Sequence, residues 1–362
     1  MKVLLLITGL GLGGAENVVL SLATQLIQRG HEVKIAYLKG QVTAQVPEHI
    51  ELCALGLDSM LALPKVVRRF KQLLKDFQPD VVHAHLFHAI IFTRIMRKLC
   101  VMPRLICTAH SKAIGGTTRR MLYRYTDALA DVNSNVSHEA TQYFIAQRAF
   151  SAQRSVTVTN GIDTGKFRYN DAYRTQYRQQ YGLSEQDVVF MAIGRFNIAK
   201  DYANLIHAFA KCASLKHKKL FIIGDGELRE QISDLIIQQQ LTEQVILLGR
   251  QFHVEHWLSM ADIFVLSSAW EGFGLVVAEA MSCERVVVAT DCGGVKEVLA
   301  SPHWLVPPKN SQALADKLRE ASALSEHEKQ HIGQQHRQQI EANYSLTRMC
   351  DDWLAIYQKN EG

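Results

Sequence analysis

The segment Ser267-Ser-Ala-Trp-Glu-Gly-Phe-Gly-Leu-Val-Val-Ala-Glu-Ala-Met281 decides the fold class of this chain. It follows the apolar run Ile263-Phe-Val-Leu266, which predicts a buried parallel strand. Two glycines then predict a turn, and the spacing of Leu275, Ala278 and Ala280 predicts a helix. The first N–H groups of a helix that follows such a turn lack partners within the helix, so they can bind an anion. The segment therefore predicts an α/β protein with a ligand site at the end of this strand.

Two carboxylates flank the predicted anion site. Glu271 lies in the turn, and Glu279 lies about two turns into the helix. Backbone N–H groups suit phosphates, and carboxylates accept hydrogen bonds from sugar or ribose hydroxyls. This combination points to a nucleotide-sugar. The alternative, for either glutamate alone, is that it only complements the helix dipole.

The string E-G-F-G-L-x-x-x-E-A-M over residues 271–281 resembles the E-x7-E motif of the retaining glycosyltransferases of family 4, which have a GT-B fold. The resemblance implies two Rossmann-like domains with doubly wound parallel sheets, which face each other across a cleft. It also implies that Glu279 holds the ribose and Glu271 the donor sugar, while the turn residues Gly272, Phe273, Gly274 and Leu275 surround the donor.

Strand-like and helical patterns alternate along the whole chain of 362 residues, with one interruption. They predict a first domain at 1–165, a polar connector at 166–187, a second domain at 188–343 and a final segment at 344–362. Two such βαβ series predict two doubly wound sheets. The expected strands are 2–8, 33–38, 80–85, 104–109, 128–133, 155–159, 188–193, 219–223, 244–248, 262–266, 286–289 and 304–306. In the GT-B fold that the chain resembles, the last helix returns to the N-terminal domain.

Glycines near the N-terminus support two readings. Gly9-x-Gly11-x-x-Gly14 formally matches the dinucleotide fingerprint, which would indicate an NAD(P)-dependent oxidoreductase. However, the second strand is followed by Lys39, where an NAD enzyme offers an acidic residue to the ribose. Gly13-Gly-Ala-Glu16 instead resembles the G-G-A-E of family 4, and we expect donor or acceptor groups to approach Gly13 and Gly14.

Three histidines are candidates for the acceptor side. His83 and His85 alternate along one strand, so their side chains share a face near its carboxyl end. The segment Thr108-Ala-His110-Ser resembles the strand-end histidine of the family, so His110 is a candidate catalytic residue as well. A purely structural, hydrogen-bonded role for the strand histidines remains the alternative.

Two cations follow the first strand of the second domain. In Gly194-Arg195, with Lys200 five residues later, a guanidinium and an ammonium group can stabilise the charge that grows on a leaving nucleoside diphosphate. Arg195, Lys200 and Glu271 are therefore candidate catalytic residues. Gly224 and Gly226 resemble the G-x-G segment that lies beneath the nucleotide in the family.

The sequence contains no D-x-D triplet, a motif with which many sugar transferases hold a divalent ion. We therefore expect neither a metal nor another cofactor, with the nucleotide-sugar as co-substrate and protein cations alone on the diphosphate.

Composition indicates where the protein works. The seven cysteines form no C-x-x-C pair and are odd in number, which favours a reducing cytoplasm. No apolar run is long enough to cross a membrane. Residues 1–165 hold 19 Lys and Arg against 11 Asp and Glu. Within this region an amphipathic helix carries apolar residues on one face and cations on the other; they are Val66, Val67, Phe70, Leu73 and Leu74, and Lys65, Arg68, Arg69, Lys71 and Lys75. This pattern favours peripheral binding to an anionic membrane surface, with an ordinary domain helix as the alternative.

Together these observations predict a retaining hexosyl- or N-acetylhexosaminyltransferase on the cytoplasmic face of a membrane. The expected donor is a UDP-sugar, although GDP-mannose stays open, and the expected acceptor is a glycan or glycolipid of lipopolysaccharide, O-antigen or another surface polysaccharide. The excess positive charge of residues 1–165 is not accompanied by a nucleic-acid-binding motif, so we do not expect a nucleic acid as a partner. A GT-B subunit that binds nucleotide-sugar without turnover is a further alternative.

Overall fold

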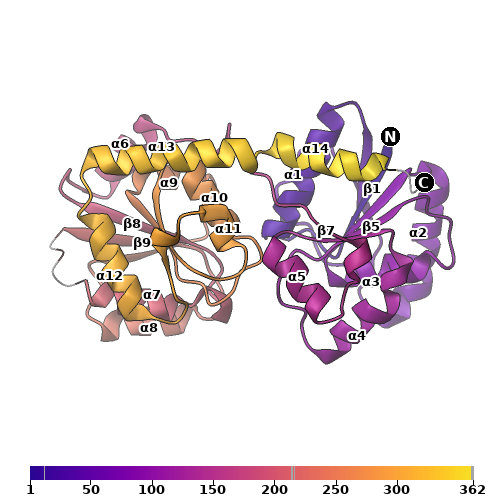
Figure 1. The fold of residues 1–362 in the computed structure, drawn as a ribbon, viewed down its shortest axis with the longest axis horizontal. Helices are drawn as coiled ribbons and strands as arrows, with labels where there is room; N and C mark the ends of the chain where they lie inside the picture. Colours follow the sequence, from indigo (N-terminus) through magenta and orange to yellow (C-terminus); the bar gives the residue numbers. More distant parts are fainter. Residues whose placement is uncertain (12, 213–214, 216, 360–362) are drawn as a thin grey trace. The chain divides into compact units, whose positions relative to one another are not determined.

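The computed structural model describes residues 1–11, 13–212, 215 and 217–359. Residue 12 of the predicted glycine turn and residues 360–362 of the final segment lie outside this range. The chain divides into two compact units. Unit 1 comprises Met1–Gly161 together with the chain from Leu346 onward, and unit 2 comprises Ile162–Ser345. Each unit is a parallel sheet with packed helices, which confirms the predicted pair of Rossmann-like domains (Figure 1).

The sheet of unit 1 has the strand order β3-β2-β1-β4-β5-β6-β7, and all neighbouring strands are parallel. Its strands are β1 (Lys2–Ile7), β2 (Glu32–Tyr37), β3 (Glu51–Ala54), β4 (Val81–His85), β5 (Leu105–Thr108), β6 (Val132–Asn135) and β7 (Ser155–Thr157). Its helices are α1 (Gly14–Gln28), α2 (Leu63–Phe77), α3 (Phe87–Met96), α4 (Thr117–Thr126), α5 (His138–Ala146) and α14 (Leu346–Gln358). The strand order reverses between β1 and β4, and ligands bind at such a switch point.

The sheet of unit 2 has the order β10-β9-β8-β11-β12-β13, and its switch point lies between β8 and β11. Its strands are β8 (Val188–Ile193), β9 (Lys218–Ile223), β10 (Val245–Gly249), β11 (Ile263–Leu266), β12 (Val286–Thr290) and β13 (Leu305–Val306). Its helices are α6 (Asp171–Gln180), α7 (Tyr202–Ala210), α8 (Arg229–Gln238), α9 (Val254–Met260), α10 (Leu275–Ser282), α11 (Val295–Leu299), α12 (Ser311–Ser322) and α13 (Glu326–Asn343).

Two strands of unit 1 differ from the prediction. Strand β3 was not predicted; its residues are half-buried or exposed at the edge of the sheet, so they lack an apolar run. The strand expected at 128–133 instead spans Val132–Asn135. Its polar residues Asn133, Ser134 and Asn135 are fully buried because side chains and backbone groups satisfy them. Hydrophobicity alone therefore placed the strand too early.

The amphipathic helix α2 does not present its apolar face to solvent. Val66, Phe70, Leu74 and Phe77 belong to the core of unit 1, where each is at most 8% exposed. This burial fits the alternative of an ordinary domain helix, because the apolar face packs in the core of its own unit. The cations of the opposite face remain exposed.

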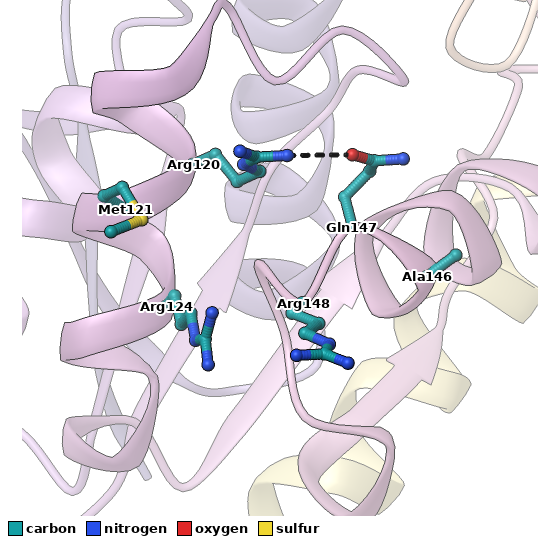
Figure 2. A pocket seen from close by; sticks show the side chains of 6 residues that line it. All are labelled: Arg120, Met121, Arg124, Ala146, Gln147 and Arg148. Atoms are coloured by element: carbon teal, nitrogen blue, oxygen red, sulfur yellow. Dashed lines mark hydrogen bonds between the residues drawn. The ribbon is translucent and has the colours of Figure 1, made fainter.

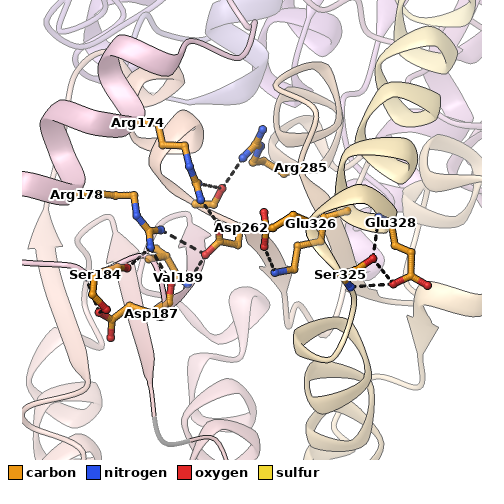
Figure 3. A network of polar contacts seen from close by, with 12 residues as sticks. Arg174, Arg178, Ser184, Asp187, Val189, Asp262, Arg285, Ser325, Glu326 and Glu328 are labelled. Atoms are coloured by element: carbon orange, nitrogen blue, oxygen red, sulfur yellow. Dashed lines mark hydrogen bonds and ion pairs between the residues drawn. The ribbon is translucent and has the colours of Figure 1, made fainter.

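The segment read as a connector, 166–187, contains helix α6, which packs against α9 within unit 2. Tyr177 lies edge-on to Trp257, with ring centroids 4.4 Å apart. Arg174 and Arg178 both reach the carboxylate of Asp262, at 2.7 and 3.4 Å (Figure 3). Edge-to-face aromatic packing and ion pairs with a buried aspartate hold this polar segment in unit 2, and the apolar pattern of the sequence does not reveal these contacts.

Candidate nucleotide-sugar site

An ion pair lies at the carboxyl edge of the unit 2 sheet. Lys200, after β8, donates to the Glu271 carboxylate, after β11, with Nζ and Oε1 2.6 Å apart. The Ser268 hydroxyl donates to the same oxygen at 2.7 Å. Both charged side chains are less than one-fifth exposed, so this pair is shielded from water. The structure thus brings together two predicted catalytic residues that are 71 positions apart in the sequence.

Close backbone contacts shape this edge of the sheet. A Cβ atom on Gly224 would lie 1.9 Å from the carbonyl oxygen of Gly194. A Cβ on Gly293, which has a φ of +57°, would lie 2.1 Å from the carbonyl oxygen of Glu271. Only glycine fits at both positions. Gly226 likewise packs against the backbone of Phe196, so the predicted glycine pair serves to stack two loops closely.

Arg195 and Lys200 contact different carboxylates. Its guanidinium pairs with Glu227 at 3.2 Å, and its side chain is 71% exposed. Exposed pairs contribute about 1 kcal/mol or less, so this arginine is held weakly. Glu227, which lies in the loop after β9, was not predicted to take part in the site. Only its position directly after Gly226 in the sequence could have indicated that Glu227 lies near the site.

Glu279 is half-buried on α10. Desolvation raises the pKa of Glu279 to about 7, with Lys166 and Lys200 opposing the shift and Glu255 adding to it. Neither Lys166 nor Glu255 was a predicted site residue. A carboxyl group with this pKa changes its charge near neutral pH.

Helix α10 begins directly after the glycine turn, as predicted. Gly274 is its N-cap, with a φ of +89°, and Leu275 is its first residue. The ring of Phe273 is buried against Tyr344, while Gly272 accepts a backbone hydrogen bond from Gly294. Contacts within unit 2 therefore hold the turn in place. The Val277 N–H already donates to Gly274 at 2.9 Å, so an anion would bind at the N–H groups that precede it, at the start of the helix.

The glycine turn of unit 1 already holds a carboxylate. Helix α1 begins at Gly14, and the Glu16 carboxylate folds back so closely that a Cβ on Gly13 would lie 2.4 Å from its Oε2. A carboxylate at this helix start complements the dipole and repels phosphate. The edge near Gly13 and Gly14 is thus better suited to hydroxyl groups, which donate hydrogen bonds, than to a diphosphate.

The three histidines lie together in unit 1. His85 Nδ1 and His110 Nε2 are 2.9 Å apart. Burial lowers the pKa of His110 to about 4 and lowers that of His85 well below its ordinary value. Both rings are therefore neutral at neutral pH. Nε2 of His85 has no hydrogen-bond partner among the described residues, although it is buried.

His83 has a different environment. It is fully buried, and its two ring nitrogens lie 2.7 Å from the Tyr357 hydroxyl and 2.7 Å from Thr108 Oγ1. Its ring also packs on Trp353 of α14. With no nitrogen left for a ligand, this side chain fits the structural alternative better than the expected acceptor contact.

Potential metal ligands occur together at one place in the described part of the chain. His253, Glu255 and His256 present ligand atoms within 4.8 Å of one another, around the start of α9. They lie outside the predicted site residues. Glu255 also raises the pKa of Glu279, so this cluster belongs to the surroundings of that carboxyl group.

A solved structure with the same architecture covers nearly the whole chain. The crystal structure of Anabaena HepE in complex with UDP aligns with a TM-score of 0.84, 21% identity and coverage of 98% of this chain and 99% of that one. Two Rossmann-like units with this topology, each with candidate residues at its switch point, define a protein of the GT-B fold.

Sequence comparison gives the family. Residues 12–166 match the profile described as Glycosyltransferase Family 4, and residues 173–339 match Glycosyl transferases group 1. The chain is a GT-B glycosyltransferase of family 4. It is 25% identical to N-acetyl-alpha-D-glucosaminyl L-malate synthase of Bacillus anthracis, over 95% of this chain and 93% of the relative. It is 24% identical to N-acetylgalactosamine-N,N'-diacetylbacillosaminyl-diphospho-undecaprenol 4-alpha-N-acetylgalactosaminyltransferase of Campylobacter jejuni, over 88% and 89%.

Membership in this family removes the oxidoreductase alternative.

None of the helices in the described part of the chain has the length and apolarity that a membrane crossing requires.

Proposed function

We infer that the protein transfers a hexose or N-acetylhexosamine from a UDP-sugar to a glycan or glycolipid acceptor, with retention of anomeric configuration and without a metal. The observation that carries this proposal is the shielded Lys200–Glu271 pair beside the start of α10, with Glu279 farther along the same helix. This arrangement offers N–H groups and a cation to a diphosphate, and carboxylates to hydroxyls.

Each donor-side residue receives a role. Lys200 and Arg195 neutralise the diphosphate as the glycosidic C–O bond breaks. Glu279 accepts hydrogen bonds from the ribose, and Glu271 accepts them from the transferred sugar. The crystal structure of HepE with UDP supports a uridine nucleotide, since that protein shares this fold.

Retention follows if the acceptor attacks on the face that the diphosphate leaves. The Glu271 oxygen that faces Lys200 already accepts from that ammonium and from Ser268, which makes the carboxylate a poor nucleophile. The leaving phosphate then removes the acceptor proton, so no covalent sugar intermediate forms. His85 and His110, both neutral, orient acceptor hydroxyls in unit 1.

The acceptor is proposed to belong to surface polysaccharide synthesis, with lipopolysaccharide and O-antigen as candidates. The name of the Campylobacter jejuni relative specifies a diphospho-undecaprenol acceptor, which supports a lipid-linked substrate. The exposed cations of α2, with Met60 and Leu61 exposed just before it, offer a surface for anionic lipid at the cytoplasmic face of a membrane.

A panel of nucleotide-sugars in a thermal-shift assay, followed by a transfer assay with excess EDTA, tests the proposal. A UDP-sugar should stabilise the protein, transfer should survive EDTA, and NMR of the product should show the donor's anomeric configuration. A product with inverted anomeric configuration would contradict the retaining mechanism. Activity that returns only with Mg²⁺ or Mn²⁺ would contradict the metal-independent mechanism. Binding without turnover on any acceptor would indicate the silent subunit instead.

A further inference from the structure

Side chains that can bind a metal ion lie in unit 2, outside the residues of the proposed transfer. They are His253, Glu255 and His256, which together form the His–Glu–His cluster. The pocket of about 270 Å³ between α4 and the end of α5 in unit 1 has the opposite character (Figure 2). Three arginines line that pocket, without a carboxylate, histidine or cysteine, so it repels a cation.

The start of α9 brings the three side chains of the cluster together. His253 is the N-cap residue, and Glu255 and His256 follow in the first turn of the helix. The backbone of His253 has a φ of +55°, in the left-handed region that favours glycine. Such a conformation costs free energy and persists where the surroundings enforce it, often at functional sites. In this arrangement the three ligand atoms lie within 4.8 Å of one another.

The distances in the cluster are close to those around a bound metal ion. Glu255 Oε1 lies 3.2 Å from His253 Nδ1 and 3.9 Å from His256 Nε2. Two ligand atoms of one tetrahedral Zn²⁺ lie about 3.3 Å apart, because each zinc–ligand distance is about 2.0–2.2 Å. Small rotations of the side chains would therefore close the cluster around an ion.

The Glu255 carboxylate still has capacity for a cation. Glu255 is only 8% exposed, and its buried Oε2 has no hydrogen-bond partner among the described residues. The Lys166 ammonium lies 3.8 Å from Oε2, which is beyond hydrogen-bonding distance, and its side chain is half exposed. Buried carboxylates are normally paired and hydrogen-bonded or coordinate a metal, and Glu255 lacks a close partner at Oε2.

Aromatic packing holds one of the two imidazoles in place. The His256 ring stacks on Tyr173 of α6, with centroids 3.5 Å apart, and its side chain is 22% exposed. A ligand whose ring is already oriented by its neighbours loses little freedom when it binds an ion.

We propose that the His–Glu–His cluster binds one zinc ion through its two imidazoles and its carboxylate. Two nitrogen ligands and one carboxylate favour Zn²⁺ over Mg²⁺ and Ca²⁺, which prefer oxygen ligands. The His253 side chain is 65% exposed, so water can complete the coordination. The ion would fix the chain between β10 and α9. The site does not rest on the proposed function, in which Lys200 and Arg195 neutralise the diphosphate without a metal.

Calorimetric titration of Zn²⁺ into protein that has been treated with EDTA and dialysed tests the site. The wild-type protein should bind one Zn²⁺ per chain. Glu255→Gln and His256→Ala should each weaken this binding by about 10²-fold or more, because even the loss of an outer-shell partner weakens metal binding by about 10- to 100-fold. The matched control His207→Ala removes an exposed histidine of the same unit and should bind Zn²⁺ as the wild type does.

A second measurement uses the wild-type protein alone, so it does not depend on how the variants fold. NMR of the imidazole nitrogens should show that Zn²⁺ shifts the signals of His253 and His256 and leaves those of His207 unchanged. Melting curves in EDTA check that the variants are folded. Failure of the wild type to bind Zn²⁺, or equal affinity in all four proteins, would overturn the site. Competition by Mg²⁺ at similar concentration would overturn the assignment to zinc.

Discussion

At the scale of single residues, the two glutamates of the opening motif have different environments. Glu271 forms an ion pair with Lys200, whereas burial dominates the surroundings of Glu279 and raises its pKa to about 7. Without a ligand, the free energy of unfolding therefore falls as the pH rises from 4.5 toward 7, since the unfolded carboxyl group loses its proton first. A ribose whose hydroxyls donate to Glu279 should favour the ionised form.

The first prediction concerns the pH dependence of nucleotide binding. Wild-type protein should bind UDP about tenfold more tightly at pH 8 than at pH 6, because ionised Glu279 accepts the ribose hydrogen bonds and the protonated form accepts fewer. Calorimetry over this pH range measures the effect. Glu279→Gln should retain only the pH dependence that comes from the phosphate of UDP itself. Identical profiles for both proteins would exclude Glu279 from the ribose site.

The second prediction separates the two cations. Arg195→Ala and Lys200→Ala should each lower kcat by about 10²-fold or more, because both act on the charge of the leaving diphosphate. Only Lys200→Ala should also lower the Tm, since it leaves the shielded Glu271 carboxylate without its partner, whereas Arg195 is largely exposed. Steady-state kinetics and calorimetric melting distinguish the two. An unchanged kcat in both variants would refute the donor assignment.

At the scale of helices and strands, local patterns predicted most of the fold. Buried strands such as β1 and β11 are continuous apolar runs, so the sequence reveals them directly. Strand β6 was predicted too early in the chain, because its buried polar residues rely on distant partners, Arg94 among them. The same reason explains why Glu227 was missed in the site, since it meets Arg195 from another loop, 32 positions away in the sequence.

The third prediction concerns the attachment of α6. Asp262, about 6% exposed, holds Arg174 and Arg178 and accepts a backbone hydrogen bond from Val189 (Figure 3). Asp262→Ala should destabilise unit 2 by about 3–5 kcal/mol, because it leaves a buried arginine unpaired. The matched control Asp234→Ala changes an exposed carboxylate of the same unit and should shift stability by less than about 0.5 kcal/mol. Urea unfolding measures both, and equal midpoints would show that α6 is held by its aromatic contacts alone.

At the scale of the whole molecule, unit 1 is discontinuous in sequence. Helix α14 lies beside α1, and its Trp353 and Tyr357 are at most 4% exposed (Figure 1). The Tyr357 hydroxyl is the partner of His83 Nδ1. The last helix of the chain therefore contributes buried side chains to the core of the unit that also contains the first strand.

The fourth prediction tests this completion. Tyr357→Phe should lower the free energy of unfolding of unit 1 by about 1–3 kcal/mol, because it leaves a nitrogen of buried His83 without a partner. Tyr125→Phe, at a side chain that is 73% exposed, should leave the stability unchanged. Hydrogen exchange resolved by segment measures the two units separately. Equal protection of the unit 1 amides in both variants would mean that packing alone holds α14.

The discontinuity of unit 1 also affects folding during synthesis. When the ribosome has made Gly161, the sheet of unit 1 is complete in strands but still lacks the helix that covers His83. All of Ile162–Ser345 must be translated first, which takes about 10–40 s at roughly 5–20 residues per second. During that interval unit 2 can fold, whereas the part of the unit 1 core that α14 covers, around His83, stays exposed to solvent. We therefore expect nascent chains stalled before Leu346 to show a protease-resistant unit 2 and a protease-sensitive unit 1, and resistance of both would refute this order.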